Sequence, residues 1–198
     1  MMIERLVLAT RNRGKVEEIR ELLAGFGIEL LSLKHFPDVP EVPEDGETFE
    51  ENARRKAEFV ARCTGLPALA DDSGLEVDAL NGAPGVRSAR FAGDDATYAE
   101  NNATLLRLME GIPPEGRTAR FRCVLALAFP DGPVRTMEGM CEGRIAEEPK
   151  GENGFGYDPL FFVPELGKTF AQIGRTEKGK ISHRGRALRR LKKVLAAL

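Results

Sequence analysis

The feature that most constrains the fold is a run of apolar residues at every second position. Its members are Ala119, Phe121, Cys123, Leu125, Leu127 and Phe129, and the turn residues Pro130, Asp131 and Gly132 follow. This period of two is typical of a strand with one buried face. A further stretch begins at Val134, so the pattern predicts a long antiparallel hairpin. The chain must therefore contain a sheet.

The start of the chain adds helices to that sheet. Residues 5–9 form a short apolar run that predicts a buried strand, and residues 28–33 form a second run. Between them Val16, Ile19, Leu22 and Leu23 recur at helical spacing, and Gly25 ends the helix. We expect an α/β fold with a mixed sheet and flanking helices.

Other elements are marked by capping boxes and apolar runs. Thr48 with Glu51, and Thr97 with Glu100, each predict the start of a helix. A last amphipathic helix is predicted from Ala187 to Leu198. Further strands are predicted at residues 67–70, 75–80 and 160–163, with a turn at residues 71–74. Because no long linker interrupts the chain, we expect a single domain covering residues 1–198.

The charges are distributed unevenly along the chain. Among 198 residues, 29 are basic and 31 are acidic, giving a net charge of −2. However, residues 174–198 hold nine Lys or Arg against one Glu, and residues 38–51 hold seven carboxylates and no Lys or Arg. This asymmetry favours an anionic ligand held with a metal. Two solvated faces of opposite charge, or a nucleic-acid-binding tail, remain alternatives.

Several classes of protein are excluded. With 42% hydrophobic and 30% charged residues, the composition is that of a globular protein. The longest apolar runs fall far below the ~18 residues of a transmembrane helix, and no secretory signal is recognisable, so we expect a cytoplasmic protein that binds no membrane. Three widely spaced cysteines argue against a disulfide framework or a zinc site. A cysteine nucleophile paired with His35 or His183 stays open.

The first constellation with chemical meaning is Thr10-x-Asn12-x-x-Lys15, where a strand turns into a helix. Free N–H groups at a helix start, with a lysine charge, can bind an anion. It is not a Walker loop, because only Gly14 is present. An Asn-capped surface helix is the plain alternative.

The second constellation is a set of carboxylates. Glu44 and Glu47 lie in a proline-rich acidic loop, and Asp71 and Asp72 follow an apolar run. Mg²⁺ takes one or two carboxylates together with phosphate oxygens, so such a set can hold it. Acidic loops are otherwise simply solvated.

Two further segments combine glycine, aromatic and basic residues. In Gly151–Pro159, Phe155 and Tyr157 offer flat faces for a base and Asp158 offers an acceptor. A glycine-rich turn that buries an aromatic is the alternative. In Lys178–Arg186, Ser182 is a good N-cap, but the basic residues after it oppose the helix dipole unless an anion or acceptor compensates. Such violations are typical of functional sites.

Taken together, these motifs resemble one family, the inosine triphosphate pyrophosphatases, also called XTP/dITP diphosphatases. The matching segments are Leu8–Lys15, Glu44–Ala53 with Lys56, Ala70–Leu75, Gly82–Arg90, Gly154–Pro159 and Ser182–Gly185. They run nearly end to end and in the family's order. Several ordered motifs are far more specific than any one of them.

The resemblance implies an elongated mixed sheet with two lobes around a central cleft, a homodimer, and Mg²⁺-dependent hydrolysis of ITP, dITP and XTP to the monophosphate and pyrophosphate. This removes such nucleotides from the pool used for DNA and RNA. The implied phosphate-binding residues are Thr10, Arg11, Asn12, Arg13, Gly14, Lys15 and Lys56. The implied metal ligands are Glu44 and Asp72, and Asp72 is also the implied catalytic residue. The implied substrate contacts are Ser73, Phe155, Gly156, Tyr157, Asp158, Lys178, His183 and Arg184.

Two points of mechanism can be argued from chemistry. A carboxylate bound to Mg²⁺ has a lowered pKa, so we expect Asp72 mainly to position the metal and to orient or accept from water. Hypoxanthine and xanthine carry a 6-oxo acceptor that suits donors from His183 or Arg184, whereas adenine presents an amino group. A pyrophosphatase with another base preference is the nearest alternative, and we expect no nucleic-acid partner.

Overall fold

The computed structural model describes residues 3–197, so Met1, Met2 and Leu198 lie outside the described part. The strands are β1 (Arg5–Leu8), β2 (Glu29–Ser32), β3 (Ala68–Val77), β4 (Thr118–Ala128), β5 (Arg135–Ile145), β6 (Phe161–Val163) and β7 (Lys168–Thr169). The helices are α1 (Arg13–Leu23), α2 (Phe49–Thr64), α3 (Tyr98–Leu108), α4 (Arg175–Ile181) and α5 (His183–Ala196). Five short 3₁₀ segments among the described residues connect them.

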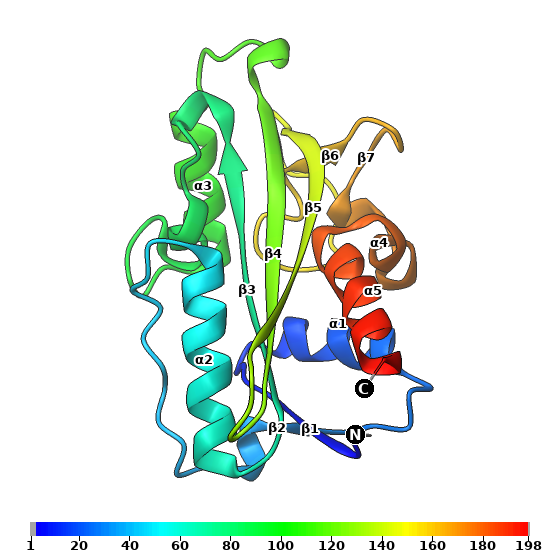
Figure 1. Ribbon diagram of the computed structural model, residues 1–198. Coiled ribbons are helices and arrows are strands. Elements are labelled where there is room, and N and C mark those ends of the chain that lie inside the picture. Colours follow the sequence, from blue (N-terminus) through cyan, green and yellow to red (C-terminus); the bar gives the residue numbers. More distant parts are fainter. Residues whose placement is uncertain (1–2, 198) are drawn as a thin grey trace. The chain divides into compact units, whose positions relative to one another are not determined.

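The strands form a mixed sheet, which confirms the predicted fold class (Figure 1). Its order is β2-β1-β3-β4-β5-β6-β7. β1 pairs in parallel with both β2 and β3, whereas β6 pairs antiparallel with β5 and β7. β4 and β5 are neighbours joined by residues 129–134, so the hairpin predicted from the period-two run is present.

The chain folds into two compact units, each built from separate segments. Unit 1 holds the described residues of Met1–Asp72, Cys123–Gly139 and Arg184–Leu198. Unit 2 holds Ser73–Arg122 and Met140–His183. Strands β3, β4 and β5 contribute residues to both units. The single domain expected for residues 1–198 stays a prediction.

Unit 1 has a sheet covered on both faces. Leu6 and Leu8 of β1 pack with Ile19 of α1 and Leu188 of α5, and all four are fully buried. Val7 points to the opposite face and is also fully buried, where α2 lies (Figure 1). Burial on both faces explains why β1 is an unbroken apolar run rather than an alternating one.

Unit 2 has an aromatic core. Phe121 of β4 packs against Phe161 with ring centroids 4.6 Å apart, and Phe170 lies 5.9 Å from Phe121 in a stacked arrangement. Leu105 and Met109, at the end of α3, complete this cluster. The apolar face of the period-two run thus contributes to the cores of both units. Phe121 belongs to the core of unit 2, whereas Cys123, Leu125 and Leu127 belong to the core of unit 1.

Helix ends follow the sequence signals. Asn12 caps α1 by accepting from the Lys15 N–H, and Thr48 caps α2 by accepting from the Glu51 N–H. At α3 the predicted capping box between Thr97 and Glu100 is complete in both directions. At α2 the Glu51 carboxylate accepts instead from the Glu47 N–H, so only half of that box forms.

The turn predicted at residues 71–74 is wrong. β3 runs without interruption from Ala68 to Val77 through this acidic stretch. Local preference disfavours aspartate in a strand, but here buried cations compensate the charge of Asp71. Tertiary ion pairing therefore overrides the turn signal.

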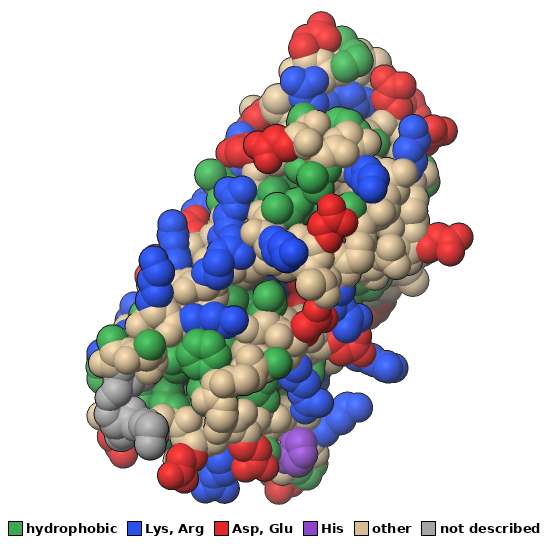
Figure 2. Space-filling model, turned by 90° about the vertical axis from the view of Figure 1, so that its right-hand side faces the viewer, with side chains coloured by type: hydrophobic (Ala, Val, Ile, Leu, Met, Phe, Trp, Pro, Cys, Tyr) green, Lys and Arg blue, Asp and Glu red, His purple; other side chains and the backbone are tan. Residues whose placement is uncertain are grey.

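The terminal helix carries much of the basic charge. α5 begins at His183, directly after Ser182, and the predicted end at Leu198 lies outside the described residues. Arg186, Arg189, Arg190 and Lys193 are exposed on it. Figure 2 looks onto the side of the molecule that carries α5, and Lys and Arg side chains cover much of it, with Asp and Glu between them. Over residues 3–197, no helix has the length and apolar character needed to span a membrane.

Candidate active site

The loop between β1 and α1 is held in place by its own polar residues. The Asn12 side chain accepts from the Lys15 N–H at 3.1 Å, and the Thr10 hydroxyl accepts from the Asn12 N–H at 3.2 Å. Arg11 donates to the Val39 carbonyl at 3.1 Å, and the exposed Arg13 pairs with Glu17. The loop is thus preorganised at a helix N-terminus, the kind of place where anions bind.

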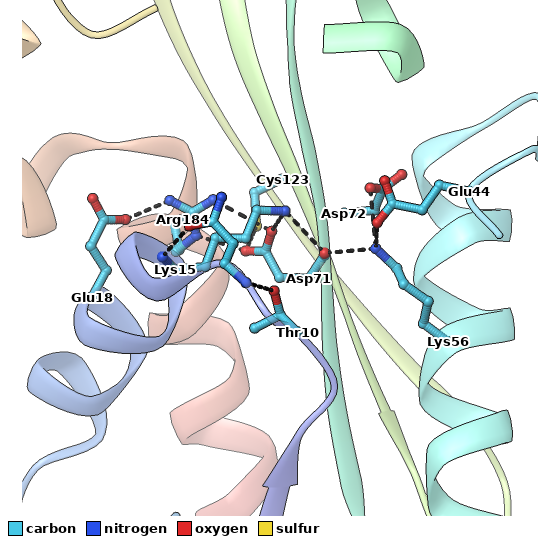
Figure 3. Close-up of polar contacts among 10 residues, drawn as sticks. Thr10, Lys15, Glu18, Glu44, Lys56, Asp71, Asp72, Cys123 and Arg184 are labelled. Carbon is cyan, nitrogen blue, oxygen red and sulfur yellow. Dashed lines mark hydrogen bonds and ion pairs between the residues drawn. The ribbon is translucent and has the colours of Figure 1, made fainter. Parts of the chain in front are cut away.

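Two lysines meet at one carbonyl oxygen. The Nζ atoms of Lys15 and Lys56 donate to the main-chain oxygen of Asp71 at 3.2 and 3.1 Å (Figure 3). Lys15 comes from α1 and Lys56 from α2, so the two helices bring their charges together at the middle of β3. The pair of phosphate lysines that the resemblance implies is therefore adjacent in unit 1.

The two expected metal ligands also converge. Lys56 Nζ lies 2.6 Å from Glu44 Oε1 and 3.4 Å from Asp72 Oδ1 (Figure 3). The other oxygen of Asp72, Oδ2, is buried with no hydrogen-bond partner. Burial raises the pKa of the Asp72 carboxyl, against the lowering effect of the Lys56 and Lys15 ammonium groups. Two carboxylates already gathered around a cation, one with an unused oxygen, fit Mg²⁺ completed by phosphate oxygens.

No group of three or more His, Cys, Asp or Glu side chains within residues 3–197 is arranged to hold a metal. Protein-bound Mg²⁺ usually keeps waters and substrate oxygens as its remaining ligands, so one or two carboxylates are enough to hold it.

Asn52 belongs to the same group, although its sequence position was not singled out. It is fully buried on α2, and its Oδ1 accepts from the Gly46 N–H at 2.8 Å. A Cβ at Gly46 would lie 2.6 Å from that oxygen, so the close approach requires glycine. Asn52 thereby ties the loop that carries Glu44 to α2.

Asp71 lies at the centre of a buried charge network. Its carboxylate accepts from Arg184 Nε at 2.7 Å and from Lys15 Nζ at 2.7 Å, and the Cys123 thiol donates to it at 3.4 Å. Arg184 also donates to Glu18 of α1. Although burial opposes ionisation, Arg184 and Lys15 hold the pKa of Asp71 well below its usual range. Removing one member of such a pair leaves its partner charged, buried and unpaired, which lowers the free energy of unfolding by about 3–5 kcal/mol.

This network places Arg184 in unit 1. The resemblance implies a base contact for Arg184, but its guanidinium is 2% exposed and lies against the two carboxylates of Asp71 and Glu18. Glu18 was not singled out from the sequence. Its spacing of three residues from Lys15, on the buried face of α1, is a signal that could have found it.

The glycine-rich segment lies in unit 2 and is organised by Asp158. The Asp158 carboxylate accepts from the Phe155 N–H at 2.9 Å and from Lys178 Nζ at 2.6 Å. A Cβ at Gly154 would lie 2.0 Å from Asp158 Oδ2, and Gly154 has φ +77°. Lys178 Nζ also lies 5.0 Å from the centroid of the Phe155 ring. Lysine, carboxylate and aromatic ring are thus brought together as expected.

Helix α3 supports this segment. Asn102 donates from its amide to the Gly156 carbonyl at 3.1 Å, and the exposed Tyr98 ring lies 6.3 Å from that of Phe155. No sequence motif singled out Asn102. The two contacts set the position of the main chain next to Phe155.

His183 and Tyr157 are both buried in unit 2. The His183 imidazole stacks on Phe121, with centroids 4.6 Å apart and planes 14° from parallel. Tyr157 donates its hydroxyl to the Ser88 carbonyl at 2.9 Å, and burial raises the pKa of this phenol. Tyr157 is therefore part of the core of unit 2. Ser73, another of the expected substrate contacts, follows Asp72 directly in β3.

A helix N-terminus with two lysines beside two carboxylates is an arrangement that can bind a polyphosphate together with a divalent cation. Comparison with known proteins then gives the family. The chain belongs to the Ham1 family, whose model matches residues 6–194.

Named relatives match over nearly their whole length. The dITP/XTP pyrophosphatase of Desulforamulus reducens is 57% identical over 194 residues, which is 98% of this chain and 96% of the relative. That of Geobacter sulfurreducens is 57% identical over 188 residues, with 95% and 94% covered. The predicted resemblance is confirmed.

Solved structures agree. A HAM1 protein from Coxiella burnetii is 46% identical, covers both chains completely and superposes with a TM-score of 0.90. The Ham1 protein of Staphylococcus aureus is 39% identical, with 98% of each chain covered and a TM-score of 0.87. The fold is therefore that of the family.

Proposed function

We propose that this chain hydrolyses ITP, dITP and XTP to the nucleoside monophosphate and pyrophosphate, which clears them from the precursors of DNA and RNA. The observation that carries the proposal is the meeting of Lys15 and Lys56 on one carbonyl oxygen, beside the carboxylates of Glu44 and Asp72. It is supported by the name dITP/XTP pyrophosphatase that relatives sharing 57% of their residues carry.

Unit 1 would bind the triphosphate. The N–H groups at the start of α1 and the ammonium groups of Lys15 and Lys56 neutralise its oxygens. Glu44 and Asp72 would hold Mg²⁺, which when bound supplies further charge neutralisation at the phosphates. The Asp72 carboxylate, with its unused Oδ2, orients the water that attacks the α-phosphorus, and pyrophosphate leaves.

Unit 2 would recognise the base. Lys178 and His183 are donors that suit the 6-oxo group of hypoxanthine and xanthine, and Phe155 offers a face for stacking. Adenine would place an amino donor against these donors, and an unpaired buried donor costs about 1–3 kcal/mol. Guanine shares the 6-oxo group, so Lys178 and His183 do not by themselves reject GTP.

The remaining parts of the proposal follow from the family resemblance. We expect a homodimer in the cytoplasm that needs Mg²⁺ and acts on free nucleotides. Sedimentation analysis of the purified chain tests the dimer directly, since monomer and dimer masses differ by a factor of two.

The test of the activity is release of pyrophosphate across a panel of ITP, dITP, XTP, GTP, ATP, dTTP and UTP, with Mg²⁺ and with EDTA. We expect turnover of the first three in Mg²⁺ and little turnover in EDTA. Equal turnover of all purines and pyrimidines would contradict the base preference, while release of orthophosphate alone would contradict the position of cleavage.

The exposed basic face of α5 motivates a second assay (Figure 2). A nucleic-acid-binding protein would bind RNA or DNA with steep salt dependence and release no pyrophosphate. Binding of that kind without any nucleotide turnover would replace the proposed function.

A further inference from the structure

The charge network around Asp71 connects four ionised side chains from three elements of unit 1. Lys15, Asp71, Arg184 and Glu18 follow one another in contact, and Glu18 lies three residues after Lys15 on α1. These three contacts, together with the turn of α1 between Lys15 and Glu18, therefore form a ring that links α1, β3 and α5, all within unit 1 (Figure 3). Two positive and two negative charges make the ring neutral.

The ring gives Lys15 one orientation. A lysine ammonium stands on a flexible four-carbon stem and by itself adopts many positions. Here Asp71 Oδ1 lies 2.7 Å from Lys15 Nζ, and the Asp71 carbonyl oxygen lies 3.2 Å from it. Two acceptors from one residue define where that ammonium lies.

Arg184 in turn orients the Asp71 carboxylate. Its Nε donates to Oδ2 at 2.7 Å, and its Nη2 lies 3.4 Å from Oδ1. This two-point contact sets the plane of the carboxylate, which leaves Oδ1 turned toward Lys15. Glu18 accepts from the remaining nitrogen, Nη1. All three guanidinium nitrogens therefore contact protein carboxylates.

Exposure separates the roles of the two cations. The Lys15 side chain is 15% exposed, whereas that of Arg184 is 2% exposed. A ligand can therefore reach Lys15, whereas reaching the Arg184 guanidinium would require breaking its pairs with Asp71 and Glu18.

We propose that Arg184 and Glu18 are positioning residues that act through the Asp71 carboxylate to fix Lys15 for phosphate binding. The proposal rests on the proposed function and deepens it, because it assigns Arg184 to the phosphates rather than to the base. Arg184 touches no substrate in this assignment.

The experiment uses Glu18→Gln and Arg184→Lys, with Arg190→Lys as the matched control. Arg190 lies on the same helix, is exposed, and donates to the Glu138 carbonyl. The probe is inorganic tripolyphosphate, which has phosphates and no base, and its binding is measured by calorimetry. The ratio of kcat/KM for ITP to that for ATP is measured alongside.

We expect both variants to bind tripolyphosphate about tenfold more weakly, the effect of roughly one charge-assisted contact. The ratio of ITP to ATP should stay within about twofold of the wild type, and Arg190→Lys should change neither quantity. In a Lys15→Met background, Glu18→Gln should have no further effect on tripolyphosphate binding, because the residue through which it acts is gone.

Three results would overturn the proposal: a changed ITP-to-ATP ratio with normal tripolyphosphate binding, an undiminished effect of Glu18→Gln without Lys15, or normal binding by both variants. If circular dichroism shows that Arg184→Lys does not fold, the tripolyphosphate binding and the ITP-to-ATP ratio of Glu18→Gln test the proposal by themselves. Failure of the proposed function is distinct, because the wild type would then not hydrolyse ITP while tripolyphosphate binding could still be measured.

Discussion

Units 1 and 2 differ in what surrounds their buried polar side chains. In unit 1, Lys15, Lys56 and Arg184 are held by carboxylates, and charge balances charge. In unit 2, His183 stacks on Phe121, and the buried Lys178 is paired with Asp158. The buried Arg117 donates to main-chain carbonyl oxygens rather than to carboxylates. The buried polar groups of unit 1 are mainly ion pairs, whereas those of unit 2 lie mainly among aromatic rings.

This difference matches two kinds of ligand chemistry. A polyphosphate carries several negative charges and has no flat surface, so lysines and a metal suit it. A purine is neutral, flat and edged with donors and acceptors, so rings and directed hydrogen bonds suit it. Substitutions in unit 1 should therefore change the turnover of every nucleotide alike, whereas substitutions in unit 2 should change the ranking of the bases.

The largest effect is expected in unit 1, for Asp72→Asn. Loss of the carboxylate removes a metal ligand and the acceptor for water, so kcat for ITP should fall by at least about a thousandfold. The melting temperature should change little, because asparagine keeps the shape of the side chain and Lys56 keeps Glu44 as its nearer carboxylate partner, at 2.6 Å against 3.4 Å for Asp72. Pyrophosphate release and thermal melts are the measurements.

Asp45→Asn is the control, because this exposed carboxylate follows Glu44 in the same loop and pairs only at the surface with Arg55. It should leave turnover unchanged. If Asp72→Asn retained wild-type turnover, the catalytic assignment in unit 1 would fail.

A smaller effect is expected in unit 2, for His183→Phe. This change keeps a ring against Phe121 but removes both ring nitrogens. The preference for ITP over ATP should fall about tenfold, the value of one hydrogen bond, while tripolyphosphate binding stays as in the wild type. His35→Phe, at the exposed histidine beside Ser32, is the control and should change neither quantity. An unaltered preference would remove His183 from base recognition.

The smallest effects concern stability against pH, and they should differ between the units. The pKa of Asp71 is lowered from 3.8, so its ion pairs stabilise the fold above about pH 4 and are lost as the pH falls below that. Burial raises the pKa of Tyr157 above its usual 10.0, so stability is complete below pH 10 and declines above it as the unfolded chain ionises first. Urea unfolding across the pH range measures both limbs.

Tyr157→Phe should remove the decline in the free energy of unfolding above pH 10. Tyr98→Phe, at the exposed tyrosine, should leave that decline unchanged. Asp71→Asn should reduce the slope of the acid limb. The comparison between the units breaks down if one substitution flattens both limbs.

Much of the fold was predictable because its signals are local. The alternation from Ala119 to Phe129, the Asn12 and Thr97 caps, and the apolar run of β1 each follow from a few neighbouring residues. The turn expected at residues 71–74 failed for the opposite reason. Arg184, more than a hundred positions away, neutralises Asp71, and no local rule contains that partner.

The site was predictable in its residues more than in their roles. The strand-to-helix loop, Lys56 and the carboxylates of Glu44 and Asp72 are close together, as the resemblance implies. Asn52 was missed, although it shares with Lys56 the face of α2 that buries Phe49 and Ala53. A polar residue at such a core position is a readable signal.

The three cysteines differ in exposure and in the unit they belong to, so their reactivity can report on each unit separately. Cys63 is exposed, whereas Cys123 lies buried in unit 1 beside Asp71 and Cys141 lies buried in unit 2. An alkylating reagent should modify Cys63 at once and reach the other two thiols only when their own unit opens. Mass spectrometry of the labelled peptides would thus time the opening of each unit separately in the unmodified native chain, and would show whether a bound nucleotide closes one unit or both.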